Sequence, residues 1–155
     1  MGVVWNGTDK TFSIYGSGKS SPASNQVLPK KGLPVAYVQV GEIYKGKGDF
    51  NKAAFWYRKA LKQKPQDATY HIYLGDNAFK YGLFKQAKNY FRSALRCSEG
   101  CLDEAYFNLG GILLGERNYS EAVKCYEHAL KIDPKNKTTK ERLDDAKLAL
   151  LIADS

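Results

Sequence analysis

Apolar residues recur with the spacing of a helix surface over most of the chain, in pairs of stretches separated by short polar turns. The clearest pair comprises residues 36–46 and 51–63, with Gly48-Asp49 between them. Apolar positions three and four residues apart indicate amphipathic helices, and glycine beside aspartate indicates a turn. We therefore expect an all-α protein in which each pair of stretches forms a helical hairpin.

The hairpin pattern occurs three times, at intervals of 34 and 35 residues, as marked by Gly41, Gly75 and Gly110. Other residues keep the same phase: Ala53, Ala87 and Ala122; Ala60-Leu61, Ala94-Leu95 and Ala129-Leu130; Phe50, Phe84 and Tyr119; Tyr57, Phe91 and Tyr126. A fixed period of this length is the signature of a repeat architecture. Glycine inside a helix costs about 1 kcal/mol relative to alanine. The three phased glycines therefore predict a close approach between the two helices of each hairpin, with the phased alanines serving the same contact.

This repeat resembles the tetratricopeptide repeat, which runs through an aromatic residue, Leu-Gly, Tyr, Ala, an aromatic residue, Ala and Pro over about 34 residues. The resemblance implies a right-handed superhelical stack of helical hairpins, a solenoid, with repeats at about 34–67, 68–102 and 103–136. The second unit departs from the pattern because it lacks a closing proline and has one extra residue in the segment 96–101. We expect a longer loop there.

The two ends of the chain fall outside the repeats. Residues 138–153 are expected to form a capping helix, because Thr138 with Glu141 fits a capping box and is followed by an apolar stripe. Residues 1–33 form an N-terminal arm: strand-like runs around Asn6-Gly7 predict a β-hairpin, and the Gly, Ser, Pro and Lys of residues 16–33 indicate a flexible linker. The arm either docks in an apolar groove or is a tail without function.

The resemblance also implies that the first helix of each unit lines a concave groove and that the second helix faces outward. The groove would be apolar and aromatic at its centre, with Glu42, Asp76 and Glu104 as fixed charges, so it should favour an apolar peptide segment with some basic character. The clamp of Lys, Asn and Arg by which some family members bind acidic chaperone tails is missing from the corresponding positions. The expected groove residues are Val38, Glu42, Ile72, Tyr73, Asp76, Phe79, Phe107, Asn108, Gly111 and Leu114.

Charge is distributed unevenly along the chain. Of the formal net charge of +8, residues 45–96 carry +9, while residues 1–44 carry +2 and residues 97–155 carry −3. Arginines and lysines four residues apart share one face of a helix, so the outward helices of the first two units should carry a convex basic ridge of Arg58, Lys62, Arg92 and Arg96. This ridge is either a solvated face that keeps the protein soluble or a docking surface for an acidic protein or an anionic surface.

Several classes of function find no support. Three cysteines fit no disulfide framework and favour a reducing, cytoplasmic compartment, and no apolar run is long enough for a membrane span. Two histidines, His71 and His128, suggest no catalytic constellation. The spacing of Cys97, Cys101 and Cys125 is atypical of a zinc site. We expect no enzyme, cofactor, metal site or nucleic-acid partner.

The expected function is that of a protein–protein interaction scaffold, or adaptor, that binds a peptide segment of a partner in its groove. The alternative is a self-assembling structural protein, a homo-oligomer formed through the N-terminal arm, the apolar end of the C-terminal helix and the opposed charges of the two halves of the chain.

Overall fold

The computed structural model describes residues 32–155, and the chain divides into two compact units, residues 1–37 and 38–155. The described residues form seven α-helices and no β-strand, so the predicted all-α fold is confirmed. The helices are α1 (Pro34–Gly46), α2 (Phe50–Gln63), α3 (Ala68–Lys80), α4 (Phe84–Ala94), α5 (Leu102–Gly115), α6 (Tyr119–Ile132) and α7 (Lys137–Asp154). The linker and β-hairpin expected before residue 32 lie outside the described residues.

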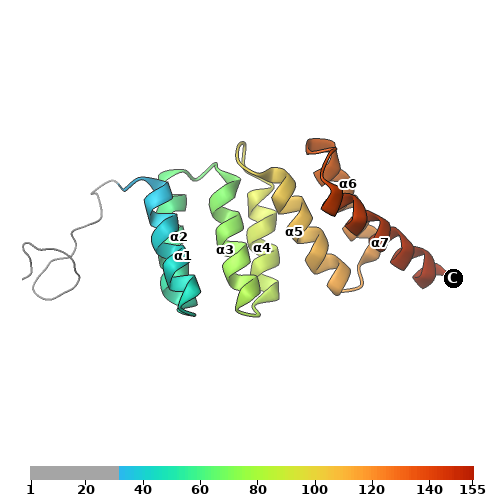
Figure 1. The fold of residues 1–155 in the computed structure, drawn as a ribbon, viewed down its shortest axis with the longest axis horizontal. Coiled ribbons are helices and arrows are strands. Elements are labelled where there is room, and N and C mark those ends of the chain that lie inside the picture. Colours follow the sequence, from blue (N-terminus) through green and yellow to red (C-terminus); the bar gives the residue numbers. More distant parts are fainter. Residues whose placement is uncertain (1–31) are drawn as a thin grey trace, which may run out of the picture. The chain divides into compact units, whose positions relative to one another are not determined.

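Within the unit 38–155 the helices pack in chain order. Figure 1 shows α3 beside α4, with α5 next to them, and α6 beside α7. Contacts join α2 to α3, α4 to α5 and α6 to α7, and α3 also touches α5 directly. The contact between α3 and α5 brings the first helices of the second and third repeats together, and α4 contacts both of them.

A glycine permits close contact between the two helices of each hairpin. A Cβ atom added at Gly75 would lie 2.5 Å from the Phe91 ring, and one added at Gly110 would lie 3.0 Å from the Tyr126 ring. Any side chain here would overlap a fully buried aromatic ring, so the predicted close approach is confirmed. The three pairs are Gly41 with Tyr57, Gly75 with Phe91, and Gly110 with Tyr126.

Small and aliphatic side chains are buried in the core between the helices. The phased alanines Ala53, Ala87 and Ala122 have no exposed surface, as their predicted role in helix contacts requires. Further along the chain, Leu109 of α5 and Ala146 of α7 belong to the same core cluster as Ala87 and Ala122. The core therefore continues without a break from the second hairpin into α7.

The joint between the second and third repeats is an ordered loop. It runs from the end of α4 to Leu102 and is longer than the loop between α2 and α3, as predicted. The backbone of Glu99 accepts a hydrogen bond from the Ala68 N–H at 2.8 Å and donates one to the Gln66 carbonyl at 3.2 Å. Gly100 has a φ of +100°, a conformation that glycine adopts readily. The extra residue is therefore accommodated by pairing with the preceding inter-repeat loop.

The start of α7 differs from the sequence prediction. Asn136 is the N-cap, and its side-chain oxygen accepts a hydrogen bond from the Thr139 N–H at 2.9 Å. Thr138 already lies inside the helix, so the predicted capping box of Thr138 and Glu141 is wrong. Asn and Thr are both effective caps. The helix begins at Lys137, so Asn136 and not Thr138 takes the cap position.

The turns within the three hairpins differ in the residue that adopts a positive φ. The first two turns place Gly48 and Gly82 at φ values of +80° and +83°, but the third places Arg117 at +65°. A residue with a Cβ atom pays about 1 kcal/mol for this conformation. Replacing Arg117 by glycine should raise the free energy of unfolding by about 1 kcal/mol in urea denaturation. The reverse change, Gly82→Arg, should lower it by a similar amount, and an unchanged or lower stability of Arg117→Gly would contradict the strain.

Candidate functional site

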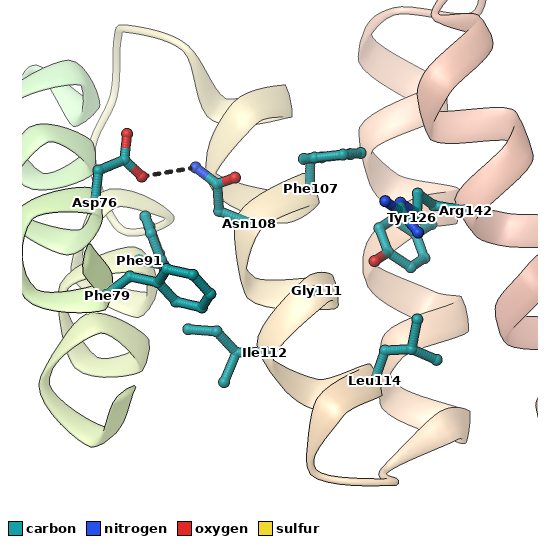
Figure 2. Close-up of a pocket in the computed structure, with 10 residues that line it drawn as sticks. All are labelled: Asp76, Phe79, Phe91, Phe107, Asn108, Gly111, Ile112, Leu114, Tyr126 and Arg142. Carbon is teal, nitrogen blue, oxygen red and sulfur yellow. Dashed lines mark hydrogen bonds between the residues drawn. The ribbon is translucent and has the colours of Figure 1, made fainter. Parts of the chain in front are cut away.

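A pocket of about 360 Å³ opens beside α5, and we call it the α5 pocket. Figure 2 shows its lining, to which α3, α4, α5, α6 and α7 all contribute. Six of the expected groove residues line it: Asp76, Phe79, Phe107, Asn108, Gly111 and Leu114. Four residues line it that the sequence did not single out for the groove: Phe91, Ile112, Tyr126 and Arg142. The structure thus brings most of the expected residues of the second and third repeats to one cavity.

Aromatic rings form the apolar part of the α5 pocket. Phe79 is 48% exposed, and its ring centroid lies 5.1 Å from that of Phe84 in an edge-to-face arrangement. Phe107 makes an edge-to-face contact with Tyr126, with centroids 5.8 Å apart. These contacts hold the rings in place while leaving part of Phe79 in water. Half-exposed aromatic surface in a concavity is what an incoming apolar side chain can bury.

Gly111 keeps the α5 wall of the pocket open. A Cβ atom added there would meet only the Tyr126 hydroxyl oxygen, at 3.8 Å, which is an ordinary van der Waals distance. Gly111 is therefore not needed for helix packing, unlike its neighbour Gly110. Its missing side chain instead leaves room in the pocket between Phe107 and Leu114.

Asp76 is the acidic group of the pocket. Its Oδ1 accepts a hydrogen bond from Asn108 Nδ2 at 3.2 Å, which crosses from α3 to α5. Burial raises the pKa of Asp76 to about 6, and the nearby carboxylates of Glu104 and Glu42 act in the same direction while Lys45 opposes them. Ionisation of Asp76 is thus unfavourable in the free protein, and an additional cation beside the carboxylate would favour it.

Glu42 and Glu104 are the other two acidic residues near Asp76. Glu42 accepts a hydrogen bond from the Tyr57 hydroxyl and forms an ion pair with Lys45, whose Nζ lies 2.7 Å from Glu42 Oε1. Desolvation tends to raise the pKa of Glu42, but the hydrogen bonds from Lys45 and Tyr57 lower it below its ordinary value. Desolvation raises the pKa of Glu104, and Asp103 adds to that shift. Lys45 therefore compensates chiefly Glu42, and Asp76 and Glu104 keep an excess of negative charge.

The remaining expected groove residues lie elsewhere. Tyr73 stacks on Tyr57 with ring centroids 5.4 Å apart, and Glu42 lies at the acidic group just described. Ile72 is 3% exposed within the core cluster, and Val38 is 8% exposed. Both are buried and offer almost no surface to a ligand, which corrects their assignment to the groove.

The residues that the sequence interpretation missed come mainly from outside the first helices. It assigned the groove to those helices alone, whereas Tyr126 belongs to α6 and Arg142 to α7. The sequence did contain an indication for Tyr126. Gly110, which contacts Tyr126, is followed directly by Gly111, and a second glycine indicates open space beside that ring. Arg142 is the only arginine of α7, but its position in the sequence does not indicate that it lines a pocket.

The four residues of the basic ridge are all exposed. The Arg58 guanidinium donates a hydrogen bond to the Tyr90 hydroxyl at 3.3 Å, which links α2 to α4 across the first two repeats. Arg96 lies in the loop after α4 and not on the outward helix as expected, and it donates to Ser93 Oγ at 3.2 Å. Lys62 and Arg92 complete the ridge, and its role as a docking surface stays a prediction.

Two other kinds of site find no counterpart in the part of the chain that the structure describes. No three His, Cys, Asp or Glu side chains within residues 32–155 lie together in a way that could hold a metal ion. No helix in the same range is both long and apolar enough to cross a membrane.

Comparisons with known proteins agree with the repeat pattern. Two family models, both described as the tetratricopeptide repeat, match residues 34–67 and 103–136, on either side of the segment that folds as α3 and α4. The chain is 31% identical over 93 residues to the tetratricopeptide repeat-containing protein trd-1 of Caenorhabditis elegans, covering 60% of this chain and 11% of that protein. It is also 31% identical over 103 residues to tetratricopeptide repeat protein 12 of Mus musculus, covering 66% and 14%. The chain thus spans a small part of the curated relatives that it matches.

A solved structure has the same fold. The first TPR of Spaghetti (RPAP3), bound to the HSP90 peptide SRMEEVD, superimposes with a TM-score of 0.68 at 21% identity, covering 76% of this chain and 95% of that one. At this identity the likeness concerns the fold. The repeat pattern, the sequence matches and the shared helical architecture together place this chain in the tetratricopeptide-repeat family.

Proposed function

We propose that this chain is a non-enzymatic scaffold that binds a peptide segment of a partner protein in the α5 pocket. The proposal rests on a pocket that combines the half-exposed Phe79, the open space at Gly111 and the acidic Asp76 in one lining. The pocket offers apolar surface together with a few polar groups, which is the usual composition of a ligand site. The peptide held by the structurally similar TPR of RPAP3 supports peptide binding by this fold.

The proposed partner is apolar with some basic character. Apolar side chains would bury the exposed surface of Phe79, and a Lys or Arg would compensate Asp76 and Glu104. An acidic tail would instead add negative charge to an acidic group and is disfavoured. A reducing, cytoplasmic compartment is part of the same proposal, since the three cysteines form no disulfide with one another.

A random peptide library displayed on phage tests the proposed site. We expect the selected sequences to combine aliphatic or aromatic residues with Lys or Arg, and Gly111→Trp to weaken their binding at least about tenfold by filling the pocket. Gly46→Trp is the matched control, because Gly46 also has open space around it but ends α1 outside the pocket. Circular dichroism should show both variants folded. Selected peptides that bind Gly111→Trp as tightly as the original chain would refute the site.

The affinity for a selected basic peptide should depend on pH through Asp76. Its pKa of about 6 in the free protein means that the carboxylate becomes protonated as the pH falls from about 7.5 to about 5, which removes the partner of the peptide's cation. Isothermal titration calorimetry should therefore show weaker binding at the lower pH. Asp76→Asn should bind more weakly at neutral pH and lose this dependence.

A control for the pH effect uses the histidine on the same helix. Desolvation and Arg96 lower the pKa of His71, which therefore also titrates in the acidic range. His71→Gln should keep the pH dependence, since the charged groups around Asp76 are Glu42 and Lys45 of α1 and Glu104 of α5. Loss of the dependence in His71→Gln, or its persistence in Asp76→Asn, would show that Asp76 is not the responsible group.

Self-assembly is the second candidate function, favoured by one feature of α7. Leu148, Leu151 and Ile152 are all exposed, with Leu151 at 68%. Clustered apolar side chains in water favour association. Light scattering across protein concentration should then show a mass that rises and that falls back in Leu151→Ser; a monomer at high concentration and low salt excludes this function.

A further inference from the structure

The α5 pocket carries opposite charges on its two sides. Figure 2 shows Asp76 projecting from α3 on one side and Arg142 from α7 on the other, with Phe107 and Gly111 of α5 between them. The wall between the two charges is largely apolar, since Ile112 and Leu114 complete it. A ligand that spans the pocket therefore meets a carboxylate, then apolar surface, then a guanidinium.

The negative charge of Asp76, on the acidic side of the pocket, is only partly compensated by cations of the protein. Asp76 receives one hydrogen bond, from an uncharged amide, and it lies near Glu42 and Glu104. The nearby cation Lys45 has its ion pair with Glu42. A partly buried carboxylate with this surrounding is stabilised when a Lys or Arg side chain binds next to it.

The basic side is equally available. The Arg142 side chain is 54% exposed, and its guanidinium lies 3.8 Å from Asp145, one helical turn further on. An exposed pair at this distance contributes little and is readily exchanged for a better partner. Arginine presents a planar fork of donors that matches a carboxylate. Arg142 lines the pocket on the same side as Tyr126, so its positive charge lies at the pocket wall (Figure 2).

We propose that the α5 pocket selects dipolar peptide segments, in which a Lys or Arg that contacts Asp76 and a carboxylate that contacts Arg142 flank a central apolar side chain. The inference rests on the proposed function and adds the charge pattern of the partner. The carboxylate belongs either to an Asp or Glu side chain or to a free C-terminus, because both present the same two oxygens to a guanidinium. Selectivity arises because a second cation at Arg142, or a second anion at Asp76, is repelled.

A set of synthetic peptides tests the charge pattern by fluorescence polarisation. Each peptide contains a central leucine with termini blocked, and Gly-Ser spacers of varied length separate it from its charged residues. We expect the best peptide with lysine on one side and aspartate on the other to bind at least about tenfold more tightly than the best peptide with lysine on both sides. It should also bind more tightly than an isomer of the same composition in which the lysine and aspartate are adjacent. Equal affinities within the set, or no binding by any member, would overturn the inference.

Charge reversal at Arg142 gives the sharper comparison. Arg142→Glu should reverse the preference, so that the peptide with two lysines becomes the tighter ligand. Lys140→Glu is the matched control, because it makes the same change in net charge at an exposed position of α7 outside the pocket. The control should keep the preference for the dipolar peptide, and a reversal in the control as well would reduce the effect to net charge and overturn the inference.

Two further comparisons complete the test. A peptide that ends in leucine with a free C-terminus, beside its amidated form, separates a terminal carboxylate from a side-chain carboxylate as the group at Arg142. Gly111→Trp separates the inference from the function on which it rests. If all peptides bind equally and Gly111→Trp weakens all of them, the charge pattern is wrong and the pocket is still the binding site. If Gly111→Trp weakens none, both are wrong.

Discussion

In each hairpin a phased glycine lies against a buried aromatic ring of the second helix. This contact brings the two helices of a hairpin together. In the third repeat, the contact between Gly110 and Tyr126 also shapes the α5 pocket. Gly110 admits the Tyr126 ring into the hairpin, while Gly111 leaves the space next to the hydroxyl end of the same ring. Gly110 thus contacts the ring of Tyr126, and Gly111 leaves space beside its hydroxyl group. Tyr126 therefore links the packing of the two helices to the opening of the pocket.

Charge is organised locally and not according to the net charge of each segment. Residues 45–96 carry a net charge of +9, and they contain all four exposed residues of the basic ridge. The same segment nevertheless contributes Asp76, the acid at the centre of the pocket. At a separation beyond the Debye length the ridge is screened, whereas a ligand inside the pocket experiences Asp76 and Arg142 directly. The two surfaces are therefore suited to partners of different charge.

The sequence predicted much of the fold and about half of the site, for a physical reason. Gly41, Gly75 and Gly110 keep phase because every repeat needs the same helix contact, so local pattern and tertiary packing agree. Phase alone does not determine how far a helix is rotated toward its neighbour, which is why Ile72 is buried although the family resemblance implied that it lines the groove. Arg142 reaches the pocket through the packing of α7 on α6, a contact that no repeat period encodes.

We propose that a peptide binds at the α5 pocket and not on the outer helices. The most direct measurement is a heteronuclear NMR titration of the ¹⁵N-labelled chain with the tightest peptide from a library selection. Binding at the pocket predicts the largest shift changes at the amides of Phe79, Asn108 and Gly111, with the Asn108 side-chain amide also perturbed because it is bonded to Asp76. Changes confined to the basic ridge around Arg58 and Arg92, with the pocket amides unmoved, would contradict it.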